Sequence, residues 1–160
     1  MLILMESNLK LDKIDRIILE KLQANAKITN SQLAQEIGLS PAPTLERVRK
    51  LENSGIIKSY HATVDTEKLG LGVGIFIQIS LNSHKKHQIK SFVNKVNHIP
   101  EVIECHHITG TADFLLRVLT KDIASYQELI LEKLVDIEEI GNMQSMVILS
   151  TFKDSKVMPV

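Results

Sequence analysis

Hydrophobic residues recur with helical spacing in the first third of the chain. Ile14, Ile17, Ile18 and Leu22 fall on one face of a helix. Asp12 stands ahead of this face and is a candidate N-cap. Because a helix this short is not stable alone, it must bury its apolar face against other elements.

Two further helices are predicted before residue 56. Thr29 and Gln32 have the spacing of a capping box that begins the second helix, and Gly38 suits the left-handed residue that closes it. The third helix is expected to begin after Ser40, a candidate cap, with Pro41 at a position where helices tolerate proline. Its predicted apolar face comprises Leu45, Val48 and Leu51.

The periodicity changes after residue 58. Alternating apolar and polar residues at 60–64 indicate an extended segment, and the polar stretch 65–70 is a candidate domain boundary. Beyond it the pattern predicts strands near 73–81, 102–108, 114–120 and 146–152, with helices near 85–97 and 123–134. The order β-α-β-β-α-β is that of a split βαβ sandwich, in which both helices cover one face of an antiparallel sheet.

These elements predict an α+β protein with two domains, at residues 8–64 and 71–156. The first would be helical and the second would contain the sheet. Apolar residues occur at both odd and even positions of the first and last predicted strands, and so on both of their faces. The sheet face that the helices leave open is therefore expected to meet another subunit.

The composition is that of an ordinary globular protein and excludes several classes. The 160 residues are 44% hydrophobic, and 19 basic side chains balance 19 acidic ones, unlike a disordered chain. One cysteine, Cys105, allows no internal disulfide, which favours a reducing cytoplasmic compartment. Residues 1–5 are too short for a signal-sequence core, and no apolar run approaches the ~20 residues needed to span a bilayer, so no membrane partner is expected.

The predicted helices have the arrangement of a helix-turn-helix unit, which places one helix in the major groove of DNA. The total charge is zero, but residues 1–60 hold 9 basic and 7 acidic side chains, whereas residues 61–160 hold 10 and 12. Within 41–60 the cations are Arg47, Arg49, Lys50 and Lys58, against Glu46 and Glu52. An ordinary solvated helix face can carry the same charges, so charge alone leaves the choice open.

The sequence resembles the Lrp/AsnC (feast/famine) family of transcription regulators. The resemblance lies in LDKIDRIIL at 11–19, LSPAPT at 39–44, RVRKLE at 47–52 and GIIKSY at 55–60. The second half agrees through ECH at 104–106, TGTADFLLRV at 109–118, IL at 148–149, Lys153 and MPV at 158–160. The resemblance implies a winged-helix DNA-binding domain and a strand linker. It also implies a βαββαβ domain that binds amino acids between subunits and assembles dimers into octamers.

The resemblance and the predicted helix starts together define candidate DNA-binding residues. They are Thr29, Asn30, Ser31, Ser40, Pro41, Ala42, Thr44, Arg47, Arg49, Lys50 and Lys58. Double-stranded DNA is the expected partner, which would place the protein at the nucleoid. Glu46 departs from the family, whose members often carry a basic residue there, and should weaken non-specific attraction to phosphates or contribute to base choice.

The turn at 109–113 is the candidate effector site. Gly110 allows close approach of the backbone, Thr109 and Thr111 offer hydroxyls, and Asp113 can receive an α-ammonium group. A plain hairpin turn explains the same residues, and only the resemblance favours a pocket. The resemblance implies four further residues of the candidate effector site, namely Ala112 in the turn and Asn142, Met143 and Ser145 in the last part of the α+β domain. No cofactor is expected, and the ligand would be a small effector such as an amino acid.

Metal-binding and enzymatic functions are alternatives to this interpretation. His106 and His107 are adjacent in a predicted strand and point to opposite faces, while His84 and His87 lack an evident third ligand, so no metal site is predicted. A tetrapyrrole enzyme similar to the sirohaem decarboxylases would use His106, His107 and Arg117, but the basic helix argues against it and against an enzyme generally. An architectural DNA-compacting protein without an effector is a further alternative.

Overall fold

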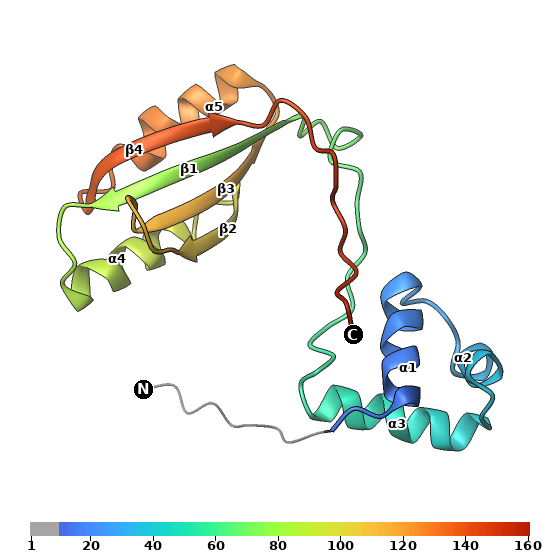
Figure 1. Ribbon diagram of the computed structural model, residues 1–160. Coiled ribbons are helices and arrows are strands. Elements are labelled where there is room, and N and C mark those ends of the chain that lie inside the picture. The colour runs from blue at the N-terminus through green and yellow to red at the C-terminus, as the bar shows by residue number, and fades with distance from the viewer. Residues whose placement is uncertain (1–9) are drawn as a thin grey trace. The chain divides into compact units, whose positions relative to one another are not determined.

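The computed structural model describes residues 10–160. The described residues up to Thr63 form one compact unit with Lys153–Val160, here called the head, and Val64–Phe152 form the second, here called the α+β unit (Figure 1). The expected domain 71–156 included residues 153–156, which group with the head. Residues 8 and 9 of the expected first domain, and residues 1–5 considered as a signal sequence, lie outside the described residues.

The head contains helices α1 (Lys13–Ala24), α2 (Asn30–Ile37) and α3 (Pro41–Asn53). Two predicted caps are confirmed, because the Asp12 carboxylate accepts the Asp15 N–H at 2.8 Å and the Thr29 hydroxyl accepts the Gln32 N–H at 3.2 Å. Ser40 occupies the N-cap position of α3, but its side chain makes no capping hydrogen bond. The first turn of α3 therefore depends on proline geometry and on packing.

The inward face of α3 differs from the predicted one. The core of the head comprises Ile18, Leu19, Leu33 and Leu51. Thr44 is fully buried and Leu45 is 38% exposed, so Thr44, rather than Leu45, shares the inward face with Val48 and Leu51. The core tolerates this threonine because its hydroxyl donates to the Ser40 carbonyl at 3.0 Å.

The α+β unit has the predicted β-α-β-β-α-β order. Its strands are β1 (Val73–Leu81), β2 (Val102–His107), β3 (Phe114–Thr120) and β4 (Ile140–Val147), and its helices are α4 (Lys86–Val96) and α5 (Ile123–Leu129). A π-helical turn, η1 (Ile130–Leu134), continues α5. The strands form one antiparallel sheet in the order β2-β3-β1-β4.

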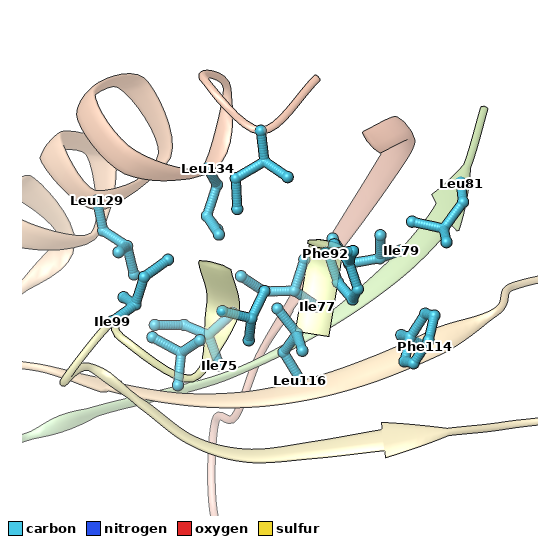
Figure 2. Close-up of a cluster of buried hydrophobic side chains, with 13 residues drawn as sticks. Ile75, Ile77, Ile79, Leu81, Phe92, Ile99, Phe114, Leu116, Leu129 and Leu134 are labelled. Carbon is cyan, nitrogen blue, oxygen red and sulfur yellow. The ribbon is translucent and has the colours of Figure 1, made fainter. Parts of the chain in front are cut away.

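The core of the α+β unit lies between one sheet face and both helices. Strand alternation buries Ile75, Ile77 and Ile79 of β1 and Leu116 and Val118 of β3. The helical side of this cluster includes Phe92, Leu129 and Leu134 (Figure 2), and Val96 of α4 belongs to the same cluster. Burial of each such side chain contributes roughly 1.5–3 kcal/mol, so the cluster accounts for a large share of this unit's stability.

The last strand begins and ends earlier than predicted. The apolar run at 146–152 indicated a strand there, but β4 spans Ile140–Val147. Its pairing with β1 places Val147 opposite Ile75, and the Ile148 N–H donates to the Gly74 carbonyl at 2.9 Å. Because β1 begins at Val73, residues after 148 have almost no strand left to pair with.

The stretch between the α3 helix and β1 carries no strand. Residues 60–64, predicted to be extended, pair with no strand within the described part of the chain. The following residues form a hydrogen-bonded turn, in which the Leu71 N–H donates to the Thr66 carbonyl at 2.8 Å. Within residues 10–160, no helix combines the length and the apolar character needed to cross a bilayer.

Candidate functional site

The first candidate site is built on the turn between α2 and α3. Gly38, with φ of 71°, closes α2, and the Leu39 N–H donates to the Ala34 carbonyl at 2.9 Å. The Asn30 side-chain amide donates to the Pro41 carbonyl at 2.8 Å and so ties the start of α2 to the start of α3. These contacts hold the two helices in a helix-turn-helix arrangement.

The outward face of α3 presents both apolar and cationic groups. Its exposed residues include Ala42, Leu45, Glu46, Arg49 and Lys50. The predicted contacts Thr29, Ser31, Ser40, Pro41 and Lys58 are exposed as well, and Asn30 is half-buried. Arg49, Lys50 and Lys58 form no ion pair within residues 10–160, so their charges are free for phosphates. Leu45 was missed because helical periodicity assigned it to the core.

Thr44 and Arg47, two predicted DNA contacts, face other parts of the head. Thr44 is buried and bonded to the Ser40 carbonyl. The Arg47 guanidinium lies 2.7 Å from carboxylate oxygens of both Asp12 and Asp15, and the Asp15 side chain is only 6% exposed. The hydrogen bonds that Arg47 donates to Asp12, first, and to Asp15, second, raise the pKa of Arg47. Arg47 thus fastens the start of α1 to α3.

The second candidate site is the turn between β2 and β3. Gly110 adopts a φ of 124°, where a side chain would be strained, and Thr109, Gly110 and Thr111 are exposed while Ala112 is buried. Asp113 receives two hydrogen bonds, from the Leu81 N–H at 2.8 Å and from His84 Nε2 at 2.7 Å. The Leu81 bond first, and His84 second, lower the pKa of Asp113. This carboxylate therefore stays ionised beside an open turn.

His84 is a part of this site that sequence reasoning did not assign. Its side chain is 69% exposed, and its Nε2 lies 2.7 Å from Oδ1 of Asp113. In the sequence His84 appeared only as a possible metal ligand with His87, because it stands 29 positions before Asp113 and no local pattern indicates their contact.

The three predicted effector residues on β4 divide between the two faces of the sheet. Asn142 pairs with Ser80, whose hydroxyl lies 3.5 Å from the Thr111 carbonyl, so Asn142 belongs near the turn. Met143 and Ser145 instead line a hollow of about 440 Å³ against α5. The other lining residues are Ile123, Tyr126, Gln127, Ile130 and Leu131, and the hydroxyls of Tyr126 and Ser145 contact each other.

Opposite the helices, the sheet face carries an ion-pair cluster among apolar side chains. Glu104 accepts hydrogen bonds from Arg117 at 2.9 Å and from His106 at 3.1 Å, and the His106 and then the Arg117 bond lower the pKa of Glu104. Phe76 pairs directly with Arg117 across the strands. This face combines the apolar surface and the fixed charges that a protein interface uses.

The remaining histidines and the cysteine do not converge. His107 stacks on Phe114, on the helix-covered face, whereas His106 bonds to Glu104 on the other. Within residues 10–160, no group of three or more His, Cys, Asp or Glu side chains is placed to hold a metal ion. Cys105 packs against the core, and burial raises the pKa of its thiol.

Comparison with known sequences identifies relatives for both units. The Lrp/AsnC ligand binding domain matches residues 74–158, and a winged helix-turn-helix DNA-binding domain matches residues 11–58. The transcriptional regulator AzlB of Bacillus subtilis is 36% identical over 150 residues, which is 94% of this chain and 96% of AzlB. The leucine-responsive regulatory protein of Escherichia coli K12 is 35% identical over 145 residues, which is 91% of this chain and 88% of that protein.

Solved structures agree with these sequence matches. A transcriptional regulator from Neisseria meningitidis, in complex with L-methionine, superimposes with a TM-score of 0.90 at 33% identity, over 94% of this chain and 97% of that one. AsnC of Escherichia coli superimposes with a TM-score of 0.86 at 31% identity, over 94% of this chain and 99% of that one. Sequence and fold therefore match the same group of proteins along nearly the whole chain.

Proposed function

The chain belongs to the Lrp/AsnC family of transcriptional regulators, and on that premise we propose how its two units bind DNA and effector. It is a DNA-binding regulator that responds to a small effector. In the proposed complex, the start of α3 enters the major groove, where Ser40 and Ala42 meet base edges. Asn30 and Pro41 hold this start in place, and Arg49, Lys50 and Lys58 neutralise phosphates.

The outward face of α3 carries this proposal, because it joins free cations to an exposed apolar residue on a helix held by a tight turn. Leu45 is suited to contact a thymine methyl group, which only the major groove presents. Thr29 and Ser31, at the start of α2, are placed for phosphate contacts.

Salt titration of DNA binding tests the proposed phosphate contacts. Each phosphate contact contributes about 0.9 to the slope of log affinity against log salt, so Arg49→Ala should lower that slope by about one. Lys121→Ala, which removes an exposed cation from the α+β unit, is the matched control. An unchanged slope in Arg49→Ala would show that this face of α3 does not meet the DNA backbone.

We further propose that the effector is an amino acid bound at the 109–113 turn. A zwitterionic amino acid needs an anionic group to bind its ammonium and hydrogen-bond donors to bind its carboxylate. Asp113 supplies the anionic group, and backbone N–H groups beside Gly110 can supply the donors. Support comes from the two hydrogen bonds that Asp113 already accepts, from the Leu81 N–H and from His84, and from relatives described as leucine-responsive or solved with L-methionine.

Calorimetric titration with L-leucine, L-methionine and a panel of other amino acids tests the effector site. Asp113→Asn should lose binding while DNA affinity without effector persists. Asp136→Asn, an exposed carboxylate elsewhere in the α+β unit, is the control. If no amino acid binds and footprints cover arbitrary DNA evenly, the architectural alternative is favoured instead.

The tetrapyrrole alternative lacks support in the side-chain arrangement. The three residues that this alternative requires do not face one site. His106 and Arg117 both bond to Glu104 on one face of the sheet, whereas His107 stacks on Phe114 on the other. Addition of haem or sirohaem to the purified protein should produce no shifted Soret band, and a specific shift would restore this alternative.

We propose that a second copy of the chain covers the open sheet face, and that such dimers assemble further, up to an octamer. Phe76, Leu115 and Met146 supply partly exposed apolar surface there, and the Glu104–Arg117 pair lies on the same face across β2 and β3. Leu149 and Phe152, 94% and 98% exposed just after β4, would also gain from a partner. Analytical ultracentrifugation over a concentration series tests the assembly state.

A further inference from the structure

The closing segment of the chain, Lys153–Val160, groups with the head although it follows the last strand of the α+β unit (Figure 1). Its anchor is Gln23 in the last turn of α1. The Gln23 side-chain amide donates to the Met158 carbonyl at 3.1 Å, and its oxygen accepts the Met158 N–H at 2.6 Å. A single side chain thus satisfies both backbone groups of Met158, in the way that a neighbouring strand would.

Apolar residues surround this anchor. The head contributes Leu19, Leu22, Ala26, Ile56 and Ile57 to a hollow of about 350 Å³, with residues 58–61 and Thr63 on its border. Met158 and Val160 border the same hollow from the closing segment, and they are two residues apart, as side chains on one side of an extended chain must be. Both stay partly exposed, at 60% and 37%, so the segment is held at the surface and can be released.

The number of connections gives this contact a mechanical meaning. Both connections leave the α+β unit at one place, because the Ile148 N–H bonds to the Gly74 carbonyl beside the start of β1. Residues 64–72 and residues 149–157 are nine residues each, and each connection can span at most about 30 Å. When Met158 is docked, two connections rather than one limit how the head can move.

We propose that the groove beside Gln23 is a docking site for the chain's own segment 153–160, and that docking latches the head to the end of β4. In the latched state the head samples a restricted range of positions. In the released state the connection through residues 64–72 alone limits the head, so a dimer accepts a wider range of half-site spacings. Because β4 carries Asn142, Met143 and Ser145, the latch also links the effector strand to the head, a consequence that rests on the proposed function.

Site-directed cross-linking tests which segment occupies the groove. Full-length protein with Gln23→Cys and Met158→Cys, in a Cys105→Ser background, is treated with a short bifunctional maleimide and separated under denaturing conditions. The expected product is an intrachain link that exceeds the yield of a control pair, Gln35→Cys with Met158→Cys. Links between chains alone would overturn the proposal in favour of a second copy's segment, and a yield no higher than the control would overturn it outright.

Hydrogen exchange and DNA spacing test what the latch does. Gln23→Ala should increase exchange several-fold in residues 20–26 and 56–61, whereas Gln35→Ala, an exposed glutamine on α2, should not. On a series of operators with altered half-site spacing, Gln23→Ala should bind the off-spacing members several-fold better relative to the best one. An unchanged spacing profile would overturn the latch.

The same two variants separate the latch from the proposed function. If wild-type protein responds to an amino acid and Gln23→Ala shows an unchanged spacing profile, the latch fails and the regulator proposal stands. If the exchange and spacing results appear but no amino acid alters DNA binding, the latch stands and the proposed effector site fails.

Discussion

Arg47 and Arg49 lie two residues apart on α3 in different electrostatic settings. Arg47 bridges Asp12 and the buried Asp15, whereas Arg49 is exposed and unpaired within residues 10–160. Arg47→Ala should therefore lower the free energy of unfolding by about 1–3 kcal/mol, because it leaves a buried carboxylate without its partner. Urea denaturation measures this, with Arg49→Ala as the variant that keeps stability and loses DNA affinity. Equal stability of the two variants would contradict the bridging role of Arg47.

His84 is expected to compete with the effector for Asp113. The His84 Nε2 lies 2.7 Å from Asp113 Oδ1 and occupies the place that an α-ammonium group would take in the proposed site. The Leu81 N–H first, and His84 second, lower the pKa of Asp113, so its carboxylate is ionised at neutral pH. His84→Ala should therefore raise the affinity for the amino acid, because the effector no longer displaces the imidazole. Calorimetric titration of both proteins measures the effect, and equal affinities would contradict it.

Residue identity predicted the caps and the turns better than it predicted the outward face of α3. Asp12, Thr29 and Gly38 act locally, so their roles can be read from neighbouring residues. The choice between Thr44 and Leu45 depends on how the whole helix is rotated against its core, which helical spacing leaves uncertain by one position. The His84–Asp113 contact joins residues 29 apart and was beyond any local rule.

At the scale of elements, Glu139 pins the start of β4 to α4. Its carboxylate accepts two hydrogen bonds from Lys95 at 2.8 and 3.1 Å, and the Lys95 bonds, followed by Ser91, lower the pKa of Glu139 to about 2. A carboxyl with a depressed pKa stabilises the fold above its unfolded pKa near 4.5, and this contribution is lost as the pH falls toward 2.

Glu139→Gln should remove that pH dependence. We expect it to cost about 1–3 kcal/mol at pH 7 and to make stability less sensitive to acid between pH 4.5 and 2. Thermal unfolding across that range measures both quantities. The control is Glu138→Gln, at a neighbouring exposed position. A variant as stable as wild type at pH 7 would show that the ion pair contributes nothing.

Strands β1 and β3 were predicted with their correct bounds because strict alternation marks a strand buried on one face. β4 begins six residues and ends five residues earlier than predicted because its own pattern is weak, and only its pairing with β1 sets its limits. The π-helical turn η1 was likewise not predicted, since its pattern reads as a plain continuation of α5.

At the scale of the whole molecule, the open sheet face is the surface on which assembly is expected to depend. Leu115→Glu places a charge among the apolar residues of that face, and it should shift the protein toward monomer and reduce DNA affinity at least tenfold, because paired heads no longer bind together. Sedimentation velocity and fluorescence anisotropy measure the two effects. Leu131→Glu, at an exposed position on η1, is the comparison. A dimeric Leu115→Glu protein would exclude this face as the interface.

The grouping of Lys153–Val160 with the head also has a consequence for biosynthesis. Helices α1 to α3 leave the ribosome early and can fold on their local contacts, but the groove beside Gln23 receives its segment only after the entire α+β unit has been translated. Nascent chains and prematurely terminated products therefore carry heads whose groove is empty. The head is therefore completed only after the α+β unit has been translated.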